Sequence, residues 1–90
     1  MQITCELSLY PLTQDYEEVI IAVIKYLKTD ADLTVITTAM STFVKGDSDK
    51  VFERLKGLYK QPSLSSVNNS LVIKIINRDL PVEDGFLTFT

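Results

Sequence analysis

The chain has 90 residues, of which 46% are hydrophobic and 23% are charged, and its net charge is −3. A chain of this length forms one domain around one core, and the acidic balance argues against a nucleic-acid binder, which needs a basic surface. The sequence contains no histidine, which excludes the common Cys/His zinc sites and histidine-dependent nucleophilic or acid–base catalysis.

The first two predicted elements are a strand and a helix. Over residues 2–10, apolar side chains alternate with the polar side chains of Thr4, Glu6, Ser8 and Tyr10, which predicts a half-buried strand. Pro11 lacks a ladder donor and should end it. Residues 14–28 carry apolar side chains at helical spacing, and Asp15 followed by Glu18 resembles a capping box.

The remaining elements are predicted from runs of β-branched residues and from the turn-forming and capping residues between them. Alternating residues predict strands over 32–39 and 40–46, joined as a hairpin, and a second helix over 48–60 is capped by Asp47 or Ser48. Residues 61–70 read as a polar loop and 71–77 as a fourth strand. Residues 1–78 then form a single domain, and the tail 79–90 ends in "FLTFT", which could add a short strand.

This element order predicts an α+β ferredoxin-like sandwich, β-α-β-β-α-β, with an antiparallel sheet of strand order 4-1-3-2 and two helices on one face. The first and third strands would then be antiparallel neighbours. We therefore expect Ser8 and Tyr10 to lie beside Ser41 and Thr42, with Thr37 and Thr38 reaching the same end of the sheet through the hairpin. Serine and threonine are also ordinary residues of solvated strands, so a pocket and a wet surface both remain open.

The fourth predicted strand is apolar on both faces, because Val72 and Ile76 flank Lys74 on one side while isoleucines occupy the other. The face of the sheet without helices should therefore be covered, and a second subunit would do this economically. We expect a homodimer or a homotetramer.

Location and chemistry are constrained by what the sequence lacks. Cys5 is the only cysteine, the chain starts without a secretory leader, and its longest apolar run, residues 19–24, is too short to span a bilayer. A cytoplasmic protein without membrane insertion is expected. An acylphosphatase-type enzyme on this fold is disfavoured, since residues 10–16, "YPLTQDY", offer neither glycine nor arginine to hold a phosphate.

Three segments resemble the YkoF-like thiamine/hydroxymethylpyrimidine-binding family: "SLYPLTQDY" (8–16), "VIIAVIKYL" (19–27) and "TTAMSTFVKGDSDKVFERLKGLY" (37–59). The resemblance implies a non-catalytic, cofactor-free protein that binds thiamine or its hydroxymethylpyrimidine moiety. It places Ser8, Ser41 and Thr42 around the pyrimidine.

Hydroxyls and a carboxylate could pair with the ring nitrogens and amine of the pyrimidine. Tyr10 could stack on a ring, and Glu6 could favour the thiazolium cation. The alternative function is a ligand-free assembly or regulatory module.

Overall fold

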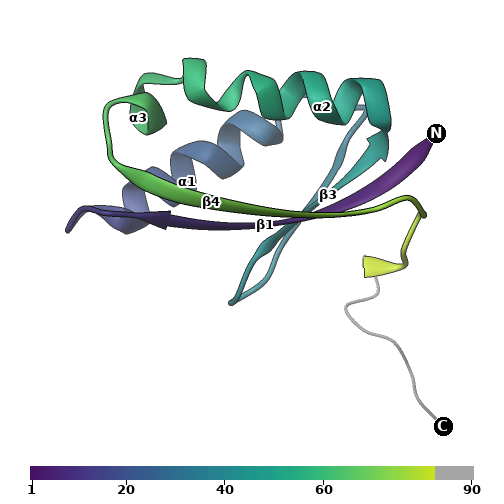
Figure 1. Cartoon of the computed structure of the whole chain (residues 1–90), viewed down its shortest axis with the longest axis horizontal. Coiled ribbons are helices and arrows are strands. Elements are labelled where there is room, and N and C mark those ends of the chain that lie inside the picture. Colours follow the sequence, from purple (N-terminus) through teal and green to yellow (C-terminus); the bar gives the residue numbers. More distant parts are fainter. Residues whose placement is uncertain (83–90) are drawn as a thin grey trace, which may run out of the picture.

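The computed structural model describes residues 1–82 of the chain and shows the expected α+β ferredoxin-like fold. Its four antiparallel strands are ordered β2-β3-β1-β4, and the helical segments lie on one face of the sheet (Figure 1). The elements in chain order are β1 (Gln2–Pro11), α1 (Tyr16–Leu27), β2 (Thr34–Thr37), β3 (Thr42–Asp47), α2 (Ser48–Lys56), the 3₁₀ helix η1 (Leu58–Lys60), α3 (Pro62–Ser65) and β4 (Asn69–Ile76).

The hydrophobic core fills the space between the sheet and the helices. Every second residue of β1 faces it, opposite the buried stripe of α1. Its members are the buried side chains of Ile3, Cys5, Leu7, Val19, Val23, Leu27, Leu33, Val44, Val51, Leu58 and Leu64. Each large member contributes about 1.5–3 kcal/mol relative to an exposed side chain, so the alternation in β1 and the helical period in α1 jointly fix the fold.

Helix α1 begins at Tyr16, and the predicted capping box is wrong. Asp15 occupies the N-cap position, but its side chain accepts no capping hydrogen bond. The buried stripe of the helix runs through Val19, Val23 and Leu27, whereas Tyr16 is half-exposed. A matching residue type at the right spacing did not suffice here, because the cap also requires extended backbone geometry at Asp15.

The second predicted helix is interrupted. Asp47 caps α2 by accepting a hydrogen bond from the Asp49 amide at 3.2 Å. Helix α2 ends at Lys56, and after Gly57 the chain forms the separate 3₁₀ helix η1. A Cβ at Gly57 would lie 2.1 Å from the Tyr26 hydroxyl oxygen, so this glycine lets the tyrosine reach α2. The predicted loop over 61–70 is partly wrong, since it contains α3, with Pro62 in the first turn, and the start of β4.

Strand boundaries also differ from the prediction. The strands expected over 32–39 and 40–46 shorten to β2 and β3, because residues 38–41 form a turn in which the Thr38 amide donates to the Ser41 carbonyl at 2.8 Å. Strand β1 includes Pro11, which pairs with Asn69 of β4. The β1–β3 ladder already stops at Leu7 and Thr42, so the missing amide of Pro11 faces a side without a strand.

Beyond β4, the chain turns back beneath the face of the sheet that carries no helix (Figure 1). Residues 79–82 contain no strand, and the predicted extra strand in the remainder of the tail lies outside the described residues. Within residues 1–82, no helix is long and apolar enough to cross a bilayer.

Candidate functional site

A cavity of about 120 Å³ opens between α1 and the sheet, beside the β2–β3 turn. Its walls are largely apolar, and hydroxyl-bearing residues gather at the turn. The lining residues are Leu7, Leu9, Ile20, Val23, Ile24, Leu27, Thr37, Thr38, Ala39, Met40, Ser41, Thr42 and Leu71. None of these side chains carries a titratable group, so the cavity offers only apolar contacts and neutral hydrogen-bonding groups.

Two threonines point from the sheet toward this cavity. Thr37 and Thr42 are directly opposite each other in the β2–β3 ladder, and Thr42 is also opposite the core residue Leu7, so all three share the helical face. Thr42 is only 8% exposed. Its hydroxyl makes no hydrogen bond with any part of the chain that the structure describes, which leaves it available to a ligand.

Thr38 lines the cavity but has a structural task. Its hydroxyl accepts hydrogen bonds from the amides of Met40 (3.2 Å) and Ser41 (3.1 Å) and donates to the Ser41 carbonyl at 3.1 Å. A threonine that bonds its own turn in this way is a known turn motif. Thr38 therefore holds the rim of the cavity in shape.

Ser41 connects the cavity to the opposite face of the sheet. Its hydroxyl donates to Glu6 Oε2 at 3.0 Å, and Glu6 Oε1 lies 3.5 Å from Lys74 Nζ. Glu6 does not line the cavity. Its carboxylate instead anchors the start of β3 from the helix-free face, where it is neutralised in part by Lys74.

Ser8 and Tyr10 are opposite Val72 and Ser70 of β4 and belong to the helix-free face. The prediction that they sit opposite Thr42 is wrong, because Thr42 is opposite Leu7 and faces the helices. Ser8 and Ser41 adjoin this last pair of the β1–β3 ladder, and their contact stays a prediction. Tyr10 is 57% exposed, and whether it or Ser8 meets a ligand stays a prediction.

The structure adds cavity residues that the sequence had not singled out as site residues. They are Met40 on the hairpin and the apolar walls from α1 and β4. Thr37, which the sequence already placed at this end of the sheet, also lines the cavity, opposite Thr42 across the turn at 38–41. The walls Ile20, Ile24 and Leu71 look like ordinary core positions, and no signal in the sequence separates them.

At the other end of the sheet, two polar side chains, Thr4 and Lys45, are buried and bonded to residues that follow β4. The Thr4 hydroxyl donates to the Arg78 carbonyl at 2.7 Å and accepts from the Leu80 amide at 3.1 Å. Lys45, which is also buried, pairs with Asp79 at 2.6 Å. Residues 78–80 therefore cover Thr4 and Lys45, and this end offers a ligand fewer available groups than the cavity does.

Ionisable chemistry is sparse in the described region. No group of three or more His, Cys, Asp or Glu side chains there is arranged to hold a metal ion. Cys5 is fully buried on the helical face of β1, and burial raises the pKa of its thiol. A thiol with a raised pKa is a poor nucleophile and behaves as a small hydrophobic residue.

The strand order and the helices on one face of the sheet define a small ferredoxin-like α+β protein, with an uncharged cavity beside the β2–β3 turn. Residues 2–73 match the YKOF-related family, and the chain belongs to that family. No match was found among curated proteins.

Solved structures of similar fold come from several microorganisms. The chain is similar to hypothetical protein MJ1052 of Methanocaldococcus jannaschii, with 27% identity, a TM-score of 0.73, and coverage of 87% of this chain and 81% of that one. Protein SP2199 of Streptococcus pneumoniae shows 26% identity, a TM-score of 0.77, and coverage of 94% and 97%. A third structure, TM0486 of Thermotoga maritima, is described as a candidate thiamine biosynthesis/salvage protein; it shares 18% identity, a TM-score of 0.78, and coverage of 93% and 95%.

Proposed function

We propose that the protein binds thiamine, or its hydroxymethylpyrimidine moiety, without transforming it, and serves vitamin uptake or salvage in the cytoplasm. The observation that carries this proposal is the cavity beside the hairpin, where the Thr42 hydroxyl is unbonded within the described chain and faces apolar walls. Membership of the YKOF-related family and the description of the Thermotoga protein support the choice of ligand.

The size of the cavity suits one six-membered ring. An engineered apolar cavity of about 150 Å³ in another protein binds benzene, and the volume here is about 120 Å³. A methylpyrimidine would place its methyl group and ring faces against leucine and isoleucine, and its nitrogens near the hydroxyls of Thr37 and Thr42. The thiazolium of thiamine would remain at the mouth, beside the exposed Met40.

The absence of a titratable side chain from the cavity lining supports a binding role rather than catalysis. General acid–base chemistry needs a proton donor or acceptor within hydrogen-bond reach of the reacting atom. Neutral hydroxyls and packing can still give micromolar affinity, which corresponds to about −8 kcal/mol.

We further propose that the binding unit is a homodimer or homotetramer in which a second subunit covers the helix-free face. Tyr10, Val72 and Ile76 expose apolar surface there, on adjacent strands. Ser8 and Glu6 belong to the same face, so a second subunit would bring them into an enclosed region. There they could contact the part of a ligand that extends beyond the cavity.

Calorimetric titration with hydroxymethylpyrimidine and with thiamine tests the function. Hydroxymethylpyrimidine should retain most of the affinity of thiamine, because the pyrimidine alone occupies the cavity. A ligand-induced rise in melting temperature should accompany the heat. The proposal fails if millimolar concentrations of both compounds give neither heat nor a thermal shift.

The second candidate function is a ligand-free assembly or regulatory module, and the exposed apolar residues of the helix-free face favour it. It predicts a stable oligomer that binds neither compound. Substitution of Val72 by Asp should change the oligomeric state under either proposal, so only the titration distinguishes them.

A further inference from the structure

We propose that the cavity beside the β2–β3 turn selects unphosphorylated ligands, because carboxylates of α1 and β1 flank its mouth with negative charge. The selection rests on the proposed function and deepens it, since it names the form of the ligand that the same site binds. Such a ligand is the substrate of a kinase rather than its product.

The candidate ligands differ in the group that would lie at the mouth. The cavity, of about 120 Å³, suits one six-membered ring. Thiamine, hydroxymethylpyrimidine and hydroxymethylpyrimidine phosphate share the pyrimidine ring and differ in what its methylene carbon carries. That carbon carries a thiazolium cation, a neutral hydroxyl or a phosphate, and a phosphate monoester has a charge of about −1.5 to −2 at pH 7. With the ring inside, the charge around the mouth discriminates among the three.

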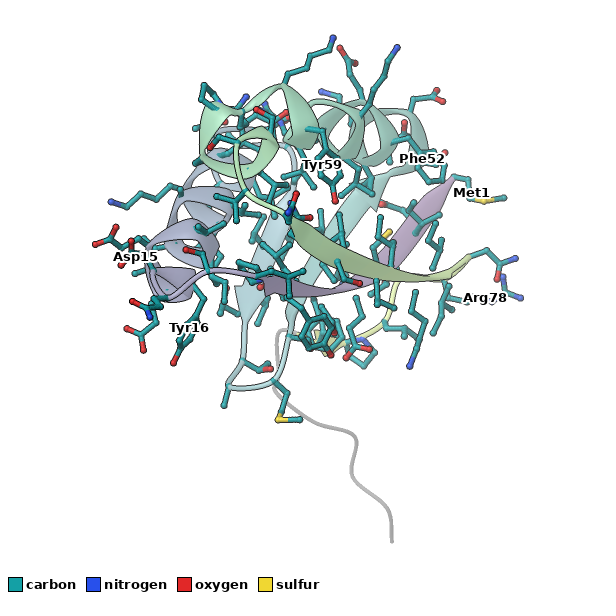
Figure 2. The ribbon with its side chains drawn as sticks, turned by 60° about the vertical axis from the view of Figure 1, so that its left-hand side comes forward. Met1, Asp15, Tyr16, Phe52, Tyr59 and Arg78 are labelled. Carbon is teal, nitrogen blue, oxygen red and sulfur yellow. The ribbon has the colours of Figure 1, made fainter. Side chains whose placement is uncertain are left out.

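Helix α1 begins at the end of the molecule that holds the mouth, and its start is acidic. Because β1 is antiparallel to β3, α1 starts at the same end as the β2–β3 hairpin, and Figure 2 shows Asp15 and Tyr16 there. Glu17 precedes the cavity residue Ile20 by three positions, so the two side chains are neighbours on the helix surface. Asp15, Glu17 and Glu18 are exposed, and none of them forms an ion pair with a described residue.

The free amides at the start of a helix can bind phosphate, but the cavity does not use those of α1. It contacts the helix at Ile20, Val23, Ile24 and Leu27, all of which lie beyond the first turn. The three carboxylates around that turn also offset the positive end of the helix dipole. The start of α1 therefore gives the mouth no site for an anion.

A further carboxylate lies behind the hairpin side of the cavity. Glu6 Oε2 accepts a hydrogen bond at 3.0 Å from the hydroxyl of Ser41, and Ser41 lines the cavity. Lys74 Nζ is 3.5 Å from Glu6 Oε1, but the lysine side chain is 71% exposed, so solvent screens much of its charge. A phosphate at the mouth would therefore meet negative charge from β1 as well as from α1.

The side chains that could hold a phosphate lie elsewhere. All nine lysine and arginine residues of the chain fall within residues 1–82, and none of them lines the cavity. Lys25 and Lys28 lie in the last turn of α1 and at its C-cap, away from the hairpin, and Lys45 pairs with Asp79. Four others line a separate groove between α1 and α2, namely Lys50, Arg54, Lys56 and Lys60. Since exposed charges act over about 8 Å at physiological ionic strength, the carboxylates dominate at the mouth.

Calorimetric titration of the full chain with the three compounds, at low and at high salt, tests the selection. Hydroxymethylpyrimidine phosphate should bind at least about tenfold more weakly than hydroxymethylpyrimidine, and high salt should narrow this difference because ions screen exposed charges. Equal or tighter binding of the phosphate would overturn the selection and leave the proposed function intact. A difference that salt does not change would overturn the role of the carboxylates. No binding of any of the three compounds would overturn both proposals.

Charge reversal at one position shows whether the mouth itself is responsible. Glu17→Lys should raise the affinity for hydroxymethylpyrimidine phosphate about fivefold and leave that for hydroxymethylpyrimidine within about twofold. Glu53→Lys is the matched control, because it changes the net charge equally at an exposed position of α2 that lines the other groove, and it should leave both affinities unchanged. Glu17→Gln should act in the same direction with a smaller effect, and it avoids placing a cation at the start of the helix. Equal effects of Glu17→Lys and Glu53→Lys, or none from either substitution of Glu17, would overturn the selection.

Discussion

Polar side chains lie toward both ends of the β1–β3 ladder, but the two ends differ in whether the threonine hydroxyls are hydrogen-bonded by the protein. At one end, the Thr4 hydroxyl is bonded on both sides by residues 78–80. At the other end, the Thr42 side chain is also largely buried, but its hydroxyl has no partner in the described chain and faces a cavity. Because no buried side-chain polar atom of the described residues lacks a partner, the Thr42 oxygen must reach the open cavity, where water or a ligand can bond to it.

The largest effect, on ligand affinity, should come from filling the cavity beside Thr42. Ile20 lies at the cavity wall and is only partly buried, so Ile20→Phe can place its ring in the space reserved for the pyrimidine. We expect affinity for hydroxymethylpyrimidine to fall at least about 100-fold, equivalent to roughly 2.7 kcal/mol. Calorimetry measures the loss, and Ile21→Phe on the exposed side of α1 serves as the control. Retained binding in Ile20→Phe would place the ligand elsewhere.

The next largest effect should come from removing the hydrogen bonds of the Thr4 hydroxyl. Thr4→Val keeps the shape of the side chain but leaves the Arg78 carbonyl and the Leu80 amide without their partner. The free energy of unfolding should fall by about 1–3 kcal/mol, as measured by urea denaturation. Ligand affinity should be unchanged. Ser8→Ala, a hydroxyl loss on the same face, is the control, and a Thr4→Val variant as stable as wild type would contradict the sealing role of residues 78–80.

The same threonine-to-valine substitution at Thr42, beside the cavity, should lower ligand affinity and leave stability nearly unchanged. Thr42→Val removes a hydroxyl that has no partner in the described chain, so stability should stay within about 0.5 kcal/mol of wild type or rise. Affinity should fall by about 1 kcal/mol, which is roughly fivefold. Paired urea and calorimetric measurements on Thr4→Val and Thr42→Val test the comparison directly. A large loss of stability in Thr42→Val would make this residue structural.

The contrast between the ends also shows what the sequence could predict. Alternation in the strands and helical spacing in the helices were sufficient to predict the order of the elements and hence the fold, because burial enforces both periods. The face on which Thr42 lies could not be predicted, because it depends on the exact β1–β3 register, which sets Thr42 opposite Leu7 rather than opposite a polar residue of β1. Glu6 and Ser41 were both expected near the site, but only the register shows that they meet on the helix-free face while Thr42 faces the cavity.

The hydrogen bonds of Thr4 to residues 78–80 could not be predicted from the sequence for a different reason. Thr4 has the same polar, alternating pattern as Ser8, and nothing local indicates that the chain returns 74 residues later to bond it. Contacts between distant segments depend on the path of the tail after β4. Short-range patterns carry no information about that path.

The smallest expected effect concerns Cys5, which lies between the two ends and faces the core opposite Val44 and Ile75. Burial raises the pKa of its thiol above the ordinary value of 9.0. Above pH 9 the unfolded chain therefore releases a proton that the folded chain retains, and stability falls with rising pH until the folded-state pKa is passed. The slope cannot exceed about 1.4 kcal/mol per pH unit.

Urea midpoints from pH 7 to 10.5 should show this loss in the wild type, in excess of the loss in Cys5→Ala. Tyrosine and lysine titrations are common to both proteins, so the difference between the two curves isolates the thiol. Cys5→Ala will be less stable at pH 7, because it leaves a small void in the core, and only the pH dependence of the difference is diagnostic. Parallel curves would show that Cys5 is solvated, and the core between the two ends would then be open rather than closed.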